Sequence, residues 1–347
     1  MRIRFSLILA GFLALALSPL GGAGAAAEET RLFRIGTGGV GGTYYPVGQG
    51  VAHAITNPTG KENCAPMPCG VAHLLAVAQT ANGSVSNLED IREGRIESGF
   101  SQSDVAYWAH MASGIYKDAE PFADIRAIAS LYREDIHLVA RKGSGIENIN
   151  DLRGRHVSLD DPGSGTIVAA RIILKAYGLQ EGELKAQYIK PADAIKKMRA
   201  GELDAFFVVA GTPSKAISEL NADGLVTLIP IDGPVAARLT KDNAFFSRTA
   251  IPADSYDGID QVRTLGVAAL WVVHKNQSEE MVYEITRKFW ENLPSVRKLG
   301  IHPKLNTINL KSAFASMSVP LHPGARRYYD EVLPAVAATL NATQNPN

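Results

Sequence analysis

The sequence lacks the features that mark several protein classes. It has two cysteines, and its 35 Lys and Arg residues balance 35 Asp and Glu residues. Without a basic excess, a broad nucleic-acid-binding surface is not expected. Hydrophobic residues make up 46% and charged residues 20%, which excludes a disordered chain, a coiled coil and a collagen-like fibre. Because 347 residues exceed the usual size of a single core, we expect two domains or lobes.

No apolar run beyond the N-terminal region is long enough for a membrane-spanning helix. At the N-terminus, Arg2 and Arg4 precede an uncharged apolar stretch at residues 5–17, and a run of small residues ends at Ala27. This layout predicts a secretory signal peptide over residues 1–27, with an uncleaved anchor helix as the alternative. We therefore expect a protein exported to the periplasm, with its signal peptide removed near Ala27.

The two cysteines fit an exported protein. Cys64 and Cys69 are five positions apart, with Pro66 and Pro68 between them. Two cysteines cannot complete a zinc site, and the spacing is not that of a redox C-x-x-C motif. In an oxidising compartment, the pair is predicted to form one local disulfide that stabilises its loop.

Short apolar runs alternate with segments of helical periodicity. The expected strands lie at residues 32–35, 96–100, 125–132, 136–141, 156–159, 204–209, 226–231 and 267–273. Expected helices include residues 192–200, 280–293 and 328–340, and one that places Val47, Val51 and Ile55 on one face. This alternation predicts an α/β fold with mainly parallel sheets.

Four turns, near Gly38, Gln102, Ser164 and Gly211, each follow an expected strand and open a helix. In open α/β sheets, ligands bind at the carboxyl ends of strands. Helix N-termini at such an edge present unpaired N–H groups and a partial positive charge, so they can hold a carboxylate without a basic side chain. Two turns precede residue 135 and two follow it, which suits two lobes that face each other across a cleft.

Several of these motifs have other interpretations. Residues 36–41 (GTGGVG) match a dinucleotide-binding fingerprint, but residues 59–70 lack the second strand and the acidic residue that should follow. Residues 162–166 (PGSGT) do not have the residue order of a nucleophile elbow (G-x-S-x-G), and they lack the lysine of a P-loop. Within them, Ser164 can act as a helix cap. The eight histidines form no H-E-x-x-H motif. We expect no cofactor and no metal.

Individual polar residues also allow two interpretations. Tyr44 and Tyr45 flank the Gly-rich loop and are either ligand contacts or plain wall aromatics. Asp104 is interpreted as a helix cap. The adjacent acids at residues 134–135 (ED) and 160–161 (DD) are either a catalytic pair or solvated turn residues, and solvated turn acids are the commoner case.

Seven motifs resemble, in order, those of the TAXI-type solute receptors of TRAP transporters. They are residues 36–46 (GTGGVGGTYYP), 83–87 (GSVSN), 101–104 (SQSD), 151–155 (DLRGR), 162–166 (PGSGT), 203–207 (LDAFF) and 321–325 (LHPGA). The motif at 151–155 is generic to many periplasmic binding proteins, whereas the first and last are more specific. The resemblance implies a two-lobed, substrate-binding fold of type II-like periplasmic binding proteins. It also implies delivery of a solute to a membrane permease driven by an ion gradient.

By motif position, the resemblance also implies a set of ligand contacts. They are Thr43, Tyr44, Asn87, Gln102, Ser164, Gly165, Thr166 and Gly211. The implied ligand is a small carboxylate, either a glutamate-like amino acid or a 2-oxo or dicarboxylic acid. Val40 stands where the family often has a small or hydroxyl residue, so we expect no side-chain contact from position 40.

These observations predict a monomeric periplasmic receptor that binds without chemistry. Residues 28–135 form lobe 1, to which residues 239–347 return, and residues 136–238 form lobe 2. Ligand bridging both lobes stabilises the closed form, which docks on TRAP permease subunits. Two alternatives stay open: a ligand sensor that signals to a membrane partner, and an exported hydrolase that uses Ser164 or an acid pair.

Overall fold

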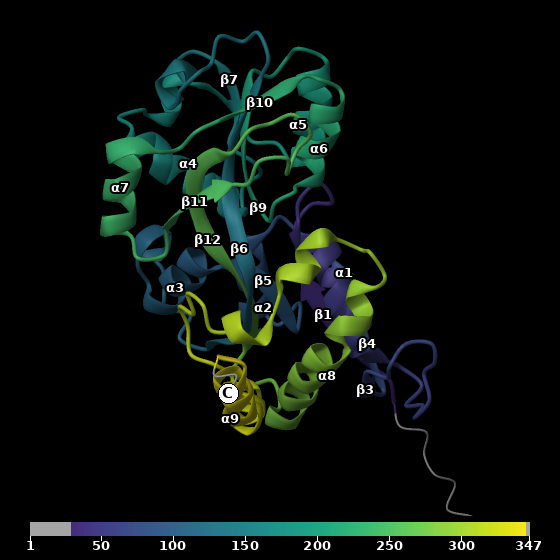
Figure 1. Ribbon diagram of the computed structural model, residues 1–347. Helices are drawn as coiled ribbons and strands as arrows, with labels where there is room; N and C mark the ends of the chain where they lie inside the picture. The colour runs from purple at the N-terminus through teal and green to yellow at the C-terminus, as the bar shows by residue number, and fades with distance from the viewer. Residues whose placement is uncertain (1–28, 345–347) are drawn as a thin grey trace, which may run out of the picture.

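A computed structural model of the chain describes residues 29–344, with side chains to residue 334 (Figure 1). The predicted signal peptide lies outside the described residues. The strands are β1 (Arg31–Gly36), β2 (Thr56–Asn57), β3 (Val71–Ala72), β4 (Leu74–Gln79), β5 (Ser98–Gln102), β6 (Ile125–Arg141), β7 (His156–Ser158), β8 (Lys185–Gln187), β9 (Ala205–Ala210), β10 (Val226–Ile229), β11 (Ser247–Ile251) and β12 (Val262–His274). The helices are α1 (Tyr44–Ile55), α2 (Ser84–Arg92), α3 (Ser103–Met111), α4 (Gly165–Ala176), α5 (Pro191–Arg199), α6 (Lys215–Ala222), α7 (Gly233–Asp242), α8 (Glu279–Arg297) and α9 (Pro323–Gln344).

The strands form a continuous mixed sheet that runs through two lobes. Its order is β3-β2-β4-β1-β5-β12-β6-β9-β7-β8, with β10 beside β6 and β11 beside β12. In one lobe β4, β1 and β5 run parallel, and in the other β9, β7 and β8 run parallel. Figure 1 shows α4 to α7 around the upper lobe and α1, α2, α3 and α8 around the lower one. The predicted two-lobed α/β fold is confirmed.

Two long antiparallel strands, β6 and β12, connect the lobes. β6 pairs with β12 over residues 125–135 and with β9 of the other lobe over residues 135–140. The register shifts between Ala269 and Leu270 and between Trp271 and Val272. Each shift leaves one extra residue in β6, first Leu131 and then Ile128, and such bulges bend the strand that carries them. A hinge movement between two lobes is absorbed by a few residues of the segments that connect them.

The crossing strands correct two predictions. Residues 125–132 and 136–141 were expected to be separate strands joined by a turn, but β6 is continuous over both. The sheet was expected to be mainly parallel, and β6 and β12 make it mixed because they run antiparallel to their neighbours. The predicted lobe limits, at residues 135/136 and 238/239, remain a proposal.

Apolar residues cover both faces of the sheet. On one face of lobe 1, Val47, Val51 and Ile55 of α1 are fully buried against β1 and α8, which confirms the predicted helix face. Trp271 of β12 is fully buried in the same core, edge-on to Phe289 of α8. At about 25 cal/mol per Å² of apolar surface, such burial supplies most of the stability of the lobe.

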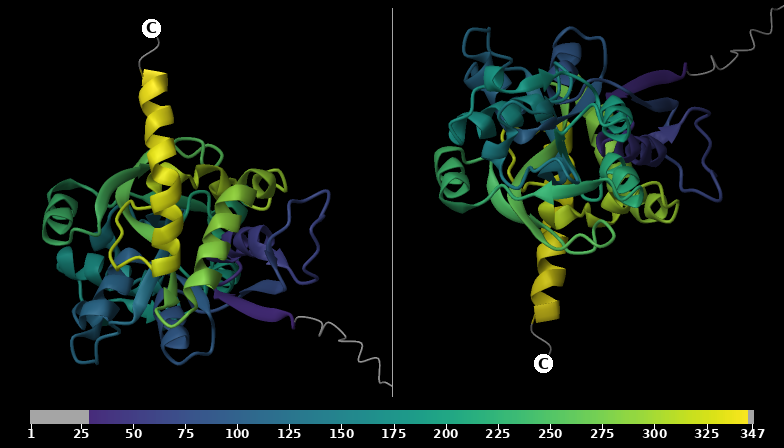
Figure 2. Two further views of the ribbon diagram at one scale, coloured as in Figure 1. Left: turned by 90° about the horizontal axis from the view of Figure 1, so that it is seen from below. Right: turned by 90° about the horizontal axis from the view of Figure 1, so that it is seen from above.

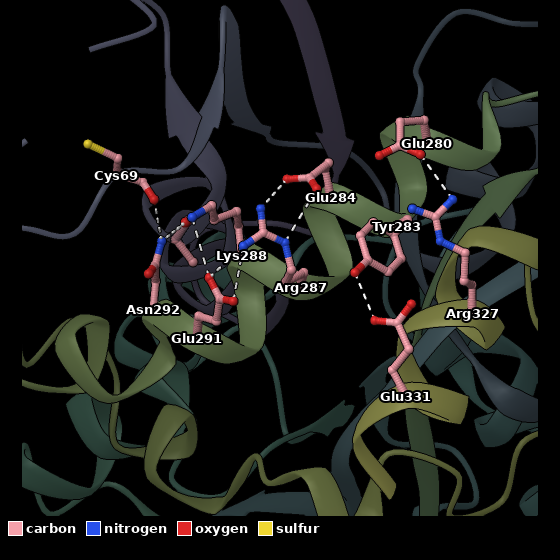
Figure 3. Close-up of polar contacts among 11 residues, drawn as sticks. Cys69, Glu280, Tyr283, Glu284, Arg287, Lys288, Glu291, Asn292, Arg327 and Glu331 are labelled. Atoms are coloured by element: carbon pink, nitrogen blue, oxygen red, sulfur yellow. Dashed lines mark hydrogen bonds and ion pairs between the residues drawn. The ribbon is translucent and has the colours of Figure 1, made fainter. Parts of the chain in front are cut away.

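Helices α8 and α9 pack side by side beneath lobe 1 (Figure 3). Arg327 of α9 lies over the ring of Tyr283 of α8 at 3.7 Å, and the Tyr283 hydroxyl donates to Glu331 at 2.8 Å. Beyond these contacts, α9 extends past the body of the molecule (Figure 2). Asn292 of α8 donates to the Cys69 carbonyl at 3.1 Å, which ties the cysteine loop to the helix. The predicted Cys64–Cys69 disulfide is present.

Candidate functional site

The candidate site is a cavity between the lobes at the carboxyl ends of β1, β4, β5, β7 and β9. Its volume is about 50 Å³. Because one water molecule occupies roughly 10–15 Å³ of such a volume, the cavity suits a small molecule rather than a polymer. Its lining comprises Gly38, Gly39, Gly42, Thr43, Tyr44, Ala81, Asn82, Gly83, Ser84, Gln102, Glu134, Asp160, Ser164, Gly165, Thr166, Lys190, Pro191, Val208 and Val209.

Helix N-termini from both lobes meet at this cavity. α1, α2 and α3 of lobe 1 begin at Tyr44, Ser84 and Ser103, and α4 and α5 of lobe 2 begin at Gly165 and Pro191. The cavity is lined by the first residue of each helix or by the residue just before it. The helix dipoles place partial positive charge around the cavity. The first residue of each helix, except Pro191 of α5, can donate its backbone N–H.

Two acidic side chains also line the cavity. Glu134, in the middle of β6, is 1% exposed, and its Oε2 accepts a hydrogen bond of 2.8 Å from the Tyr44 hydroxyl. Burial raises the pKa of Glu134 to about 8, and the negative charges of Asp104 and Asp135 add to this rise. Asp160 follows β7 with a φ of 75°, and its Oδ1 accepts from the Asp161 backbone N–H at 2.7 Å. Burial raises the pKa of Asp160 to about 7.

A third buried acid, Asp104, lies behind the cavity wall rather than in its lining. Its Oδ1 accepts from the backbone N–H of Val105 at 2.9 Å, and its Oδ2 has no hydrogen-bond partner among the described residues. Burial raises its pKa to about 7. The single cationic side chain among the lining residues is Lys190, which is half-exposed and lies 3.7 Å from Asp161. The cavity is therefore richer in acidic than in basic groups.

The lobes touch each other around the cavity, so the structure is in a closed conformation. The backbone N–H groups of Val85 and Ser86 donate to the Gly163 carbonyl at 3.0 Å each. On the other side, Thr43 Oγ1 donates to the Gly211 carbonyl at 2.8 Å. These contacts can form only when the lobes approach, which is how a two-lobed protein couples ligand capture to a change of shape.

Six of the predicted ligand contacts gather at the cavity: Thr43, Tyr44, Gln102, Ser164, Gly165 and Thr166. Ser164 also caps α4, since its Oγ accepts from the Ile167 N–H at 3.2 Å. Thr166 Oγ1 accepts from the Val209 N–H at 3.1 Å, which fixes α4 against β9. That these six contact a ligand remains a prediction.

The other two predicted contacts lie outside the lining. Asn87 is fully buried, and its amide donates 2.8 Å hydrogen bonds to the carbonyls of Thr37 and Phe100. It joins the loop after β1 to β5. Gly211 meets Thr43 of the opposite lobe through its carbonyl and belongs to the contact between lobes.

Sequence reasoning missed the acids of the site. Of the two interpretations of residues 134–135 and 160–161, the commoner one, solvated turn acids, is wrong for Glu134, Asp135 and Asp160, which are buried. The error at residues 134–135 came from taking the charged triplet 133–135 (RED) as a turn between two strands, residues 125–132 and 136–141. A usable signal was the strongly apolar sequence on both sides of the triplet, which fits one long buried strand. Ser84 and Lys190, at the starts of α2 and α5, were also missed.

The buried acids predict an unusual pH dependence of stability. The pKa values of Glu134 and Asp160 lie above their ordinary values of 4.5 and 3.8, so the folded protein binds more protons than the unfolded chain. Their stabilising contribution is complete below about pH 4 and is lost as the pH rises through about 8. Burial lowers the pKa of His137 to about 4, which acts in the opposite direction but only below about pH 6.5.

The ligand-free protein is therefore expected to melt at a lower temperature at pH 8.5 than at pH 7. The loss of unfolding free energy should approach about 1.4 kcal/mol per pH unit for each proton released. Thermal unfolding in buffers of constant ionic strength measures this. Glu134→Gln, which cannot ionise, should flatten the slope. A melting temperature that rises over this pH range would contradict the prediction.

Comparison with solved structures supports the fold. The periplasmic binding protein BugD is 10% identical, with a TM-score of 0.53 over 88% of this chain and 97% of that one. A Bordetella bronchiseptica RB50 protein is 16% identical, with a TM-score of 0.51 over 88% and 89%. The aliphatic sulphonate binding protein SsuA of Escherichia coli is 17% identical, with a TM-score of 0.46 over 86% and 82%. At these identities, the likeness to BugD and to the Bordetella bronchiseptica protein, both with TM-scores above 0.5, shows the fold alone.

Within residues 29–344, no helix is both long and apolar enough to cross a membrane. The same part of the chain contains no group of three or more His, Cys, Asp or Glu side chains placed to hold a metal ion. The family described as NMT1-like matches residues 35–332. This match covers most of the sequence, and the chain belongs to the NMT1-like family.

Proposed function

We propose that the protein is a periplasmic receptor that captures a small carboxylate between its lobes and delivers it to a membrane permease. The observation that carries this proposal is the meeting of five helix N-termini at one small cavity between the lobes. Such N-termini stabilise a carboxylate without a mobile basic side chain. The contacts across the lobes supply a closed state that a bridging ligand stabilises.

The TRAP type of permease is the finer part of the proposal. It is supported by the motif resemblance, above all by residues 36–46 and 321–325. The first of these motifs supplies Thr43 and Tyr44 to the cavity, while the second places the N-terminus of α9 beneath lobe 1. Uptake by proteoliposomes that contain candidate permease subunits would test it. An ion gradient should drive uptake, and a requirement for ATP hydrolysis would contradict the TRAP assignment.

Thermal unfolding against a ligand panel tests the receptor function. The panel pairs each small carboxylic acid with its primary amide. A ligand at about 100 times its Kd adds roughly 2.7 kcal/mol, which should raise the melting temperature by several degrees. We expect a shift with a subset of the acids and none with their amides. Equal shifts with acid and amide, or shifts only with sulfonates or sugars, would contradict a carboxylate receptor.

A further inference from the structure

The acidic side chains of the cavity restrict the charge of the ligand that can bind there. Helix N-termini account for a carboxylate on the ligand, but they leave Glu134 and Asp160 without a role. Lys190 cannot neutralise both acids, because it is half-exposed and lies beside Asp161. A dianionic ligand would disfavour the ionised form of these two carboxyls, because like charges in a buried site repel strongly, whereas a cationic group would favour it.

Glu134 is held in a fixed position at the centre of the site. It lies on the strand that crosses between the lobes, and the Tyr44 hydroxyl donates to its Oε2. Tyr44 is itself buried, edge-on to Phe100 at 5.6 Å between ring centroids. One hydrogen bond uses only part of the acceptor capacity of a carboxyl group, so Glu134 can still accept from a donor in the cavity.

A second buried acceptor lies in the same lining. Gln102 is 2% exposed, and its Oε1 has no hydrogen-bond partner among the described residues. An unsatisfied buried amide oxygen is costly, and a ligand N–H would satisfy it. The Glu134 carboxyl and Gln102 Oε1 therefore favour a ligand that donates hydrogen bonds and carries positive charge at one end.

We propose that Glu134 is the specificity-determining residue of the site and recognises a protonated amine on the ligand. The receptor then takes amino acids in preference to the matching 2-oxo or dicarboxylic acids. This inference rests on the proposed function, since the helix N-termini hold the carboxylate of the same ligand. A zwitterion matches both halves of the cavity, because its carboxylate meets the N-termini and its ammonium meets the acids.

Isothermal titration of the mature protein with matched ligands tests the inference. The pairs are L-glutamate with 2-oxoglutarate, L-alanine with pyruvate and L-leucine with 4-methyl-2-oxopentanoate. Within the pair that fits the cavity, we expect the amino acid to bind about 100-fold more tightly. Losing one partner of a buried charge pair typically has at least this effect.

Glu134→Gln is expected to remove the discrimination. Its affinity for the amino acid should fall about 100-fold, while its affinity for the 2-oxo acid should stay the same or rise. Glu202→Gln is the matched control, because Glu202 is exposed and lies outside the cavity. It should bind both members of a pair as the unaltered protein does.

The pH dependence of affinity gives an independent readout that needs no variant. The charged or titratable groups around Glu134 are Tyr44, Asp104, Tyr132, Asp135 and Lys304. Burial keeps Glu134 protonated near neutral pH, so an ammonium ligand must displace that proton on binding. Between pH 6 and 8, amino-acid affinity should rise by up to about tenfold per pH unit, and 2-oxo-acid affinity should fall.

The outcomes separate the two proposals. If 2-oxo acids bind as tightly as amino acids, or if Glu134→Gln keeps the preference for the amine, the inference about Glu134 is overturned and the carboxylate receptor stands. If neither member of any pair binds, and the acid–amide panel is also flat, the carboxylate receptor itself is overturned.

Discussion

Gly165→Ala is expected to weaken ligand binding by about 10- to 100-fold while leaving the fold intact. A Cβ at this position would lie 2.5 Å from Cδ and Nε2 of Gln102 and 2.7 Å from Oγ of Ser84. Gly165 opens α4 in lobe 2, whereas Gln102 and Ser84 belong to lobe 1. The clash therefore exists only when the lobes are closed, and the cost of overpacking, about 1–3 kcal/mol, falls on that state alone.

The neighbouring groups cannot move away easily. Gln102 is buried, and Ser84 Oγ accepts from the Gln102 backbone N–H at 3.0 Å. In the open state, by contrast, alanine favours the helix over glycine by roughly 1 kcal/mol. The variant should thus melt at the same temperature as the unaltered protein, or higher, when ligand is absent.

Isothermal titration measures the loss of affinity, and small-angle X-ray scattering measures closure. With saturating ligand, the unaltered protein should become more compact, and Gly165→Ala should stay expanded at the same ligand concentration. Gly182→Ala is the control, because its Cβ would meet no atom within 4 Å. Unchanged affinity and normal compaction in Gly165→Ala would show that ligand does not require this close approach of the lobes.

The turns and the acids of the site differ in how far the sequence could predict them. The turns of the site were predictable, because small and hydroxyl residues after a strand mark a helix start at the ligand edge of an α/β sheet. The burial of Glu134 was predictable only in part. The apolar sequence on both sides of it indicates one long strand, but the crossing of β6 between the lobes does not follow from the sequence. That path is set by pairing with β12 and β9, strands far away in the sequence.

Asn87 shows a second limit. Its motif, residues 83–87, lines the cavity through Gly83 and Ser84, neither of which was predicted as a ligand contact. The resemblance carries the position of a residue in its motif but not the direction of its side chain. In α2, the side chain three positions after Ser84 turns away from the cavity and into the sheet, where it meets Thr37 and Phe100.

Asn87→Ala is accordingly expected to lower the free energy of unfolding by about 3 kcal/mol. The variant leaves the carbonyls of Thr37 and Phe100 without their donors, at roughly 1–3 kcal/mol for each buried group, and opens a small cavity. For a chain of this size, the melting temperature should fall by about 4–5 °C. Thermal and urea unfolding of the ligand-free protein measure the change.

Ligand affinity separates the role of Asn87 inside lobe 1 from a role as a ligand contact. In Asn87→Ala, affinity at a temperature where the variant is folded should stay within about threefold of the unaltered value, because Asn87 does not line the cavity. Asn82→Ala is the matched control, since Asn82 lines the cavity and its amide donates to Pro162 O at 3.3 Å in the opposite lobe. That variant should keep its stability within about 0.5 kcal/mol, because its hydrogen bond is exposed. If Asn87→Ala instead lost affinity without losing stability, Asn87 would reach the ligand, as its motif position predicts, and would have no structural role inside lobe 1.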